Sequence, residues 1–187
     1  MITIHCDGAC KKNPGESGVG IYITHNNKTL IQLHEYIGVA TNNVAEYISV
    51  LRALEELKKI QLFNESVPLT LTMDSELVIK QLKGEYQIKQ PQLKILHTEL
   101  MNQIKSNNIQ ITYNWVRRDN NSTADELANT AITNKTPTTQ YIQSLLQQLK
   151  QTDSTQQLHQ PQNSLQQYSQ SNSLNNSSNT KPSTNNQ

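Results

Sequence analysis

Four acidic side chains stand where strands or helices are expected to begin or end: Asp7, Glu46, Asp74 and Asp125. Carboxylates that lie close together raise one another's pKa and cost free energy unless a cation neutralises them. Oxygen ligands suit hard divalent cations, and such cations catalyse displacement at phosphorus. If the fold brings the four acids together, they predict a metal site for phosphodiester chemistry.

Two of the acids close apparent strands with the same alternation. Residues 2–7 place Thr3, His5 and Asp7 on one face and the apolar residues on the other, because successive side chains of a strand alternate. Residues 69–74 repeat this pattern and end in Asp74. We expect the two acids to meet at one sheet end if the strands are neighbours.

The other two acids precede apolar stripes with helical spacing. Val50, Ala53 and Leu57 follow Glu46 at i+4, i+7 and i+11, and Asp125 is followed by Ala128 and Ile132 at i+3 and i+7. Both acids are therefore expected to point inward from the first turns of their helices.

Each acid also has an ordinary structural explanation. Asp7-Gly8 fits a turn and Asp74-Ser75 fits a helix N-cap, while Glu46 and Asp125 can belong to capping boxes. Any one acid taken alone favours this explanation. Four inward-facing acids together favour a shared site.

The predicted elements that would position these acids form an α/β sheet with an antiparallel half. Three strands are expected first, with Asn26-Asn27 as a hairpin turn, and strands then alternate with helices. The expected strands cover residues 2–7, 18–24, 29–38, 69–74 and 109–116. The expected helices cover residues 43–62, 75–83, 91–105 and 124–133.

Five separated motifs resemble type 1 ribonuclease H in order and spacing, over roughly residues 1–135. They are Asp7-Gly8-Ala9-Cys10-Lys11-Lys12-Asn13-Pro14-Gly15, Gly18-Val19-Gly20, Thr41-Asn42-Asn43-Val44-Ala45-Glu46, Met73-Asp74-Ser75 and Ala124-Asp125-Glu126-Leu127-Ala128-Asn129. The resemblance implies the ribonuclease H-like fold, a five-stranded mixed sheet with helices on both faces.

The chemistry implied by the resemblance is endonucleolytic hydrolysis of the RNA strand of an RNA/DNA hybrid, leaving a 5′-phosphate and a 3′-hydroxyl. By the family pattern, Asp7 would bridge two Mg²⁺ ions, Asp74 and Asp125 would each flank one, and Glu46 would hold the ion on the leaving-group side. Mn²⁺ is a working substitute, because both ions prefer oxygen ligands.

The resemblance also implies which residues contact the hybrid. Cys10, Asn13, Asn42 and Asn43 match positions that read 2′-hydroxyls in the minor groove, and Thr41 matches a contact to a DNA phosphate. The alternative is structural, since Asn13-Pro14-Gly15 is a good turn and Thr41 or Asn42 a good N-cap.

Two departures from better-known members stand out. The loop before Asp125 has no histidine, and Arg118 is the expected replacement, helping product phosphate to leave; a solvated charge is the alternative. The basic protrusion that grips DNA is missing, because residues 84–90 are too few for it. Trp115 is expected in the core.

Composition divides the chain near residue 135. Residues 1–135 carry equal numbers of acidic and basic side chains, whereas 36 of the 52 residues from 136 to 187 are Gln, Asn, Ser or Thr. We therefore expect a catalytic domain over 1–135 and a largely disordered tail over 136–187, with an amphipathic helix over 141–149. That helix would pack on the domain or dock a partner, whose identity the sequence leaves open.

The remaining features restrict the cellular setting. Cys6 and Cys10 form no zinc motif, and neither a signal peptide nor a membrane-spanning apolar run is seen. We expect a cytoplasmic protein with reduced thiols and no membrane partner, with the nucleus left open.

Other functional classes fit the same fold. A non-catalytic nucleic-acid-binding module would not need the intact acid quartet, and a different nuclease or transposase-like enzyme would space its acids differently. A third alternative makes the tail the functional part and the domain its anchor.

Overall fold

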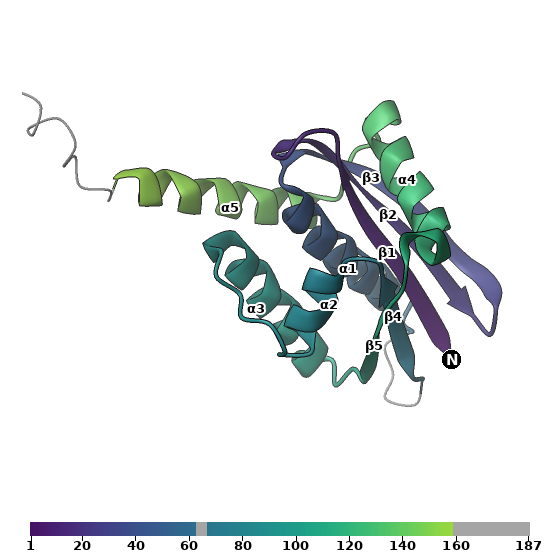
Figure 1. Ribbon diagram of the computed structural model, residues 1–187. Coiled ribbons are helices and arrows are strands. Elements are labelled where there is room, and N and C mark those ends of the chain that lie inside the picture. The colour runs from purple at the N-terminus through teal and green to yellow at the C-terminus, as the bar shows by residue number, and fades with distance from the viewer. Residues whose placement is uncertain (63–66, 159–187) are drawn as a thin grey trace, which may run out of the picture. The chain divides into compact units, whose positions relative to one another are not determined.

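The computed structural model in Figure 1 describes residues 1–62 and 67–158 and contains a five-stranded mixed sheet of order β3-β2-β1-β4-β5. Strands β1, β2 and β3 pair antiparallel, and β4 pairs parallel with both β1 and β5. The strands are β1 Ile2–Cys10, β2 Gly15–His25, β3 Lys28–Ala40, β4 Leu69–Met73 and β5 Ile111–Trp115. The predicted mixed sheet is confirmed.

Helices cover both faces of the sheet, as expected for the ribonuclease H-like fold. In Figure 1, α4 lies on one face, and α1, α2 and α3 lie on the other. The helices are α1 Asn42–Lys59, α2 Glu76–Leu82, α3 Pro91–Ser106, the short 3₁₀ helix η1 Arg118–Asn121, α4 Ser122–Asn134 and α5 Gln140–Leu158.

Local sequence explains why the first elements form. Asn26 and Asn27 take the positive φ values of 51° and 63° that a tight hairpin turn needs, and asparagine tolerates them better than most residues. At the start of α1, the Thr41 hydroxyl accepts a hydrogen bond from the Val44 N–H at 3.3 Å. The apolar stripe behind Glu46 is fully buried, so α1 faces the sheet as predicted.

Helix α5 is longer than the helix expected over 141–149, and it packs back onto the body of the protein. Ile142, Leu145 and Leu149 are buried in the same core as β1 and α1. Hydrogen bonds also hold the segment before α5 against the body of the protein. The Thr136 carbonyl accepts from the Tyr36 N–H at 2.6 Å, and the Thr139 hydroxyl donates to Glu55 at 3.0 Å. The stretch from residue 159 onward, predicted to be disordered, lies outside the described residues.

Trp115 does not lie in the core, so the sequence prediction is wrong at this position. Its side chain is 46% exposed. The reason is that β5 is an edge strand and Trp115 is its last residue, where the chain leaves the sheet. The indole N–H instead donates to the Asp74 carbonyl at 3.1 Å.

In the part of the chain that the structure describes, no helix is both long and apolar enough to cross a membrane.

Candidate active site

Asp7 and Asp74 lie at one end of the sheet because β1 and β4 are parallel neighbours. The register pairs Ile2 with Leu69 and His5 with Thr72, so the two acids are reached after the same number of residues. Asp7 is buried and Asp74 is half-buried just beyond the end of β4. The strand alternation in the sequence predicted this meeting correctly.

Glu46 joins them because β1 passes unusually close to the start of α1. A Cβ atom on Gly8 would lie 2.2 Å from the Glu46 backbone nitrogen, so only glycine fits. The Gly8 N–H donates to Glu46 Oε2 at 3.2 Å. One carboxylate oxygen each from Asp7, Glu46 and Asp74 lies within 4.8 Å of the other two.

Asp125 reaches the site from the opposite face of the sheet. Asp7 pairs with Gly20 on β2, and a Cβ on Gly20 would lie 2.0 Å from the Ala124 carbonyl oxygen, so α4 packs directly on the strand. Asp125 lies near enough to raise the pKa of Asp7. It stands outside the compact group of three acids, and its Oδ1 forms an ion pair with the Arg118 guanidinium.

Burial and the neighbouring negative charges make ionisation of Asp7 and Glu46 unfavourable. Burial, followed by the charges of Asp74 and Asp125, raises the pKa of Asp7 to about 7. Burial and the charges of Asp7 and Asp74 also raise the pKa of Glu46 well above its usual value, against the opposing hydrogen bond from Gly8. A cluster with these properties gains free energy when a divalent cation binds between the oxygens.

The donor set fits a hard cation. The three grouped ligands are carboxylates from β1, α1 and the end of β4, and they line a cavity of about 320 Å³ together with Cys10, Asn42 and Arg118. Among the described residues, no histidine or thiol belongs to the grouped ligands. Oxygen-only ligands favour magnesium or manganese over softer metals.

Asn121 is a site residue that the sequence analysis missed. Its side chain is 1% exposed, and its Nδ2 donates to Asp74 Oδ1 and to the Cys6 carbonyl, each at 2.9 Å. It therefore fixes one acid relative to the neighbouring strand. The sequence does not mark this residue, because asparagine is common in polar loops. Its role depends on a contact with Cys6, which lies 115 residues earlier in the chain.

Of the residues expected to contact a hybrid, Cys10 and Asn42 line the acid cavity, and Thr41 lines a separate cavity. Asn13 Oδ1 accepts from the Asn42 N–H at 3.1 Å, and the Cys10 thiol lies 3.3 Å from the Ala40 carbonyl oxygen. Thr41 and Asn43 are half-buried at the start of α1. Thr41 caps this helix, so the N-cap role alone explains the contact that its hydroxyl makes in the absence of substrate.

Comparison with known proteins identifies the family. The RNase H family model matches residues 1–133. The chain is 35% identical over 133 residues to the bifunctional protein Rv2228c of Mycobacterium tuberculosis, and the match covers 70% of this chain and 35% of that protein. It is 32% identical to a putative hydrolase, EbsB, of Enterococcus faecalis, with 71% of this chain and 94% of that protein covered.

Solved structures agree with this assignment. LC11-RNase H1 in complex with an RNA/DNA hybrid superposes with a TM-score of 0.69 at 36% identity, covering 72% of this chain and 98% of that one. The N-terminal RNase H domain of rv2228c gives 0.63 at 34% identity, covering 70% and 98%. The chain spans about a third of the length of the mycobacterial protein. It belongs to the RNase H family.

Proposed function

We propose that this protein is an endonuclease that hydrolyses the RNA strand of RNA/DNA hybrids and leaves 5′-phosphate and 3′-hydroxyl ends. The observation that carries the proposal is the group of three carboxylates within 4.8 Å, two of them buried. Membership of the RNase H family and the hybrid bound by the similar LC11-RNase H1 support the choice of substrate.

Asp7, Glu46, Asp74 and Asp125 would hold two Mg²⁺ ions. When bound, the ions would activate water and stabilise charge at phosphorus. Glu46 and Asp74 would be ligands from the start of α1 and the end of β4, and Asp125, which pairs with Arg118, would contribute from α4. Metal and proton compete for the same oxygens, since the pKa values of Asp7 and Glu46 are raised.

Arg118 is proposed to assist the departure of the product phosphate. Its guanidinium is 70% exposed and its pairing with Asp125 holds it at the mouth of the acid cavity. A planar cation in this place can bind phosphate with two parallel hydrogen bonds. Support for this role comes from its location and charge.

Recognition of the RNA strand is assigned to the cavity rim. Cys10, Asn13, Asn42 and Asn43 would supply polar groups to 2′-hydroxyls, and Thr41 would contact a phosphate of the DNA strand. Cys10 and Asn42 line the same cavity as the acids, which supports contact with the strand that is cut.

Catalysis is proposed to need only residues 1–135. Deletion of residues 136–187 should leave hybrid cleavage detectable, while lowering the melting temperature because Ile142, Leu145 and Leu149 leave the core. Deletion of residues 159–187 alone is the matched control and should change neither quantity. Loss of cleavage by a folded 1–135 fragment would move the catalytic boundary.

The proposal is tested with a panel of end-labelled substrates in Mg²⁺. Cutting should be confined to the RNA strand of the hybrid, with single-stranded RNA and duplex RNA left intact, and the products should carry 5′-phosphate and 3′-hydroxyl ends. A folded protein that binds hybrid without cutting it in Mg²⁺ or Mn²⁺ would instead be a non-catalytic binding module.

A further inference from the structure

A second cavity, of about 330 Å³, adjoins the acid cavity at the start of α1. Thr41 lines the second cavity and its neighbour Asn42 lines the first. Four separate parts of the chain form the walls: Pro14 in the β1–β2 connection, the end of β3 with the start of α1, the first turn of α3, and α5. The two cavities are therefore neighbours at the start of α1.

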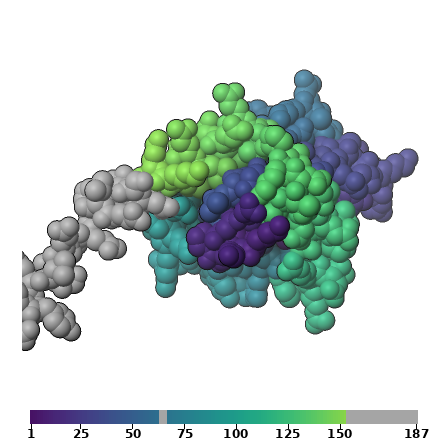
Figure 2. Space-filling view, turned by 90° about the horizontal axis from the view of Figure 1, so that it is seen from above, coloured from purple at the N-terminus to yellow at the C-terminus, as the bar shows by residue number. Residues whose placement is uncertain are grey.

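One wall of this cavity comes from outside the family match. The RNase H model ends at residue 133, whereas Leu146, Leu149 and Lys150 belong to α5. Figure 2, which looks down on this face, shows yellow-green α5 directly beside the purple and indigo segments that carry the β1–β2 connection and the start of α1. Helix α5 therefore contributes to this surface from beyond the part of the chain that the family model matches.

The position of α5 is fixed by its contacts. Tyr141 donates to Glu99 on α3 at 2.8 Å, and Thr138 donates to the buried Glu35 on β3. Ile142, Leu145 and Leu149 are almost completely buried. A side chain on the exposed side of such a helix keeps a defined position relative to Thr41.

The chemistry of the cavity suits a deoxyribose-phosphate strand. The apolar side chains Val39 and Leu146 form part of its lining, and Val39 is 62% exposed. The Thr41 hydroxyl and the Lys150 ammonium group supply a donor and a positive charge for phosphate. A ribose 2′-hydroxyl packed against Val39 and Leu146 would lose water without gaining a partner, so the DNA strand is favoured over RNA.

We propose that α5 forms part of the hybrid-binding face, with Lys150 contacting a phosphate of the DNA strand beside the one bound by Thr41. Val39 and Leu146 pack against the sugars of the same strand. This inference rests on the proposed function. It places the DNA strand, which is not cut, on a surface separate from the acid cavity.

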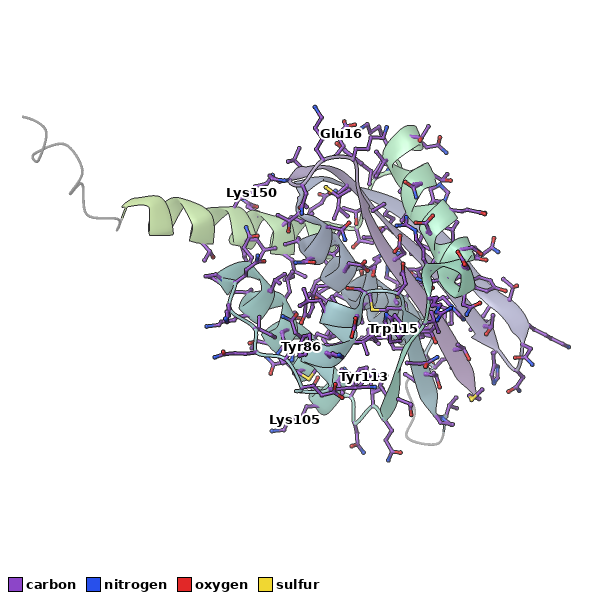
Figure 3. The ribbon with its side chains drawn as sticks, viewed as in Figure 1. Glu16, Tyr86, Lys105, Tyr113, Trp115 and Lys150 are labelled. Atoms are coloured by element: carbon purple, nitrogen blue, oxygen red, sulfur yellow. The ribbon has the colours of Figure 1, made fainter. Side chains whose placement is uncertain are left out.

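Charge removal at Lys150 provides the test, with Lys105 as the matched control. Both lysines are exposed, and Figure 3 shows Lys105 at the opposite end of the helical layer from Lys150. Lys150→Gln should raise KM and the hybrid Kd about five- to tenfold with kcat unchanged, and should reduce the slope of log Kd against log salt by about 0.9. Lys150→Arg should restore both, and Lys105→Gln should behave as wild type.

A second pair of variants tests the choice of strand. The test uses Asp74→Asn, which should bind without cutting. In this background, Leu146→Ser should reduce the ratio of the duplex-RNA Kd to the hybrid Kd, because a ribose 2′-hydroxyl would then have the serine hydroxyl as a polar partner. Exposed Leu30→Ser, on β3, is the control and should leave the preference unchanged.

The outcomes separate the two proposals. Active wild type with Lys150→Gln indistinguishable from Lys105→Gln would overturn the role of α5 and leave the proposed function standing. Wild type that neither binds nor cuts hybrid would overturn both.

Discussion

Helix α1 carries two buried charged side chains that the fold treats in opposite ways. Arg52 is 4% exposed, and its Nε donates to the equally buried Glu35 at 2.8 Å. Glu46, also 4% exposed, faces Asp7 and Asp74, and its Oε2 accepts a hydrogen bond from the Gly8 N–H at 3.2 Å. The charge of Arg52 is neutralised within the fold. Glu46 has like charges as its nearest charged neighbours, which is the arrangement expected where a cation binds.

The difference separates structural from functional acids. Burial alone marks neither class, because Glu35 and Glu46 are buried alike. What distinguishes them is the sign of the nearest charge: a guanidinium beside Glu35, two carboxylates beside Glu46. Unneutralised acids in a cavity are the arrangement expected at a metal site.

Removal of the guanidinium should have the largest effect on stability. Arg52→Met leaves Glu35 buried without its cation and should cost about 3–5 kcal/mol in the free energy of unfolding, measured by urea denaturation. Adding Glu35→Gln should recover part of the loss. A cost below about 1 kcal/mol would contradict the contrast between the two regions.

The acid cluster should respond to pH in the opposite sense from a paired carboxylate. Because the pKa of Asp7 is raised from 3.8 to about 7, its protonated form stabilises the fold below pH 4, and this contribution is lost as pH rises through 7. In a chelator, the protein should therefore be more stable at pH 5 than at pH 8, by about 1–3 kcal/mol.

Asp7→Asn should remove most of this pH dependence and stabilise the metal-free protein at pH 8. Each kcal/mol gained in the free energy of unfolding should raise the melting temperature by about 2–4 °C. Mg²⁺ should stabilise wild type at pH 8 and not this variant. Asp119→Asn, at an exposed position of η1, is the control. Thermal unfolding curves that are the same for all three proteins would refute the interpretation of the cluster.

Asn121→Ala should weaken metal binding by about tenfold or more, because Asp74 loses the donor that orients it. Calorimetric titration of Mn²⁺ into the protein without substrate measures this directly. Asn120→Ala, at an exposed neighbour, should bind as wild type. If the melting temperature falls while Mn²⁺ affinity stays the same, Asn121 only supports the fold.

Arg118→Gln should produce the smallest effect, a decrease in kcat of about two- to fivefold with little change in KM, because solvent and salt screen the attraction of a 70% exposed guanidinium for phosphate. Steady-state kinetics on hybrid check this, with Arg117→Gln as the control. An unchanged kcat would leave Arg118 as a solvated charge.

Sequence predicted the parts of the site that depend on periodicity. Strand alternation located Asp7 and Asp74, and the helical stripe behind Glu46 placed that acid beside them. Asp125 is only partly buried and stands outside the group of three, paired with Arg118. It missed Asn121, because no periodic pattern marks a loop amide that bridges two strands. It misplaced Trp115, because alternation alone does not show that a strand lies at the edge of a sheet.

The extent of α5 also exceeded the prediction. A Gln-rich sequence with few apolar residues predicts only a short helix, yet three of those residues suffice to anchor it once α1 and α3 offer a surface. That surface depends on tertiary packing and is not visible in the local composition.

The catalytic role of the acid cluster is tested most directly by cleavage of a labelled RNA/DNA hybrid as a function of Mg²⁺ concentration, by wild type and by Asp74→Asn. Wild type should cut the RNA strand only when Mg²⁺ is present, and the folded variant should not cut at any Mg²⁺ concentration. Cleavage by the variant at the wild-type rate, or by wild type in a chelator, would contradict the assignment of the acid cluster as the catalytic metal site.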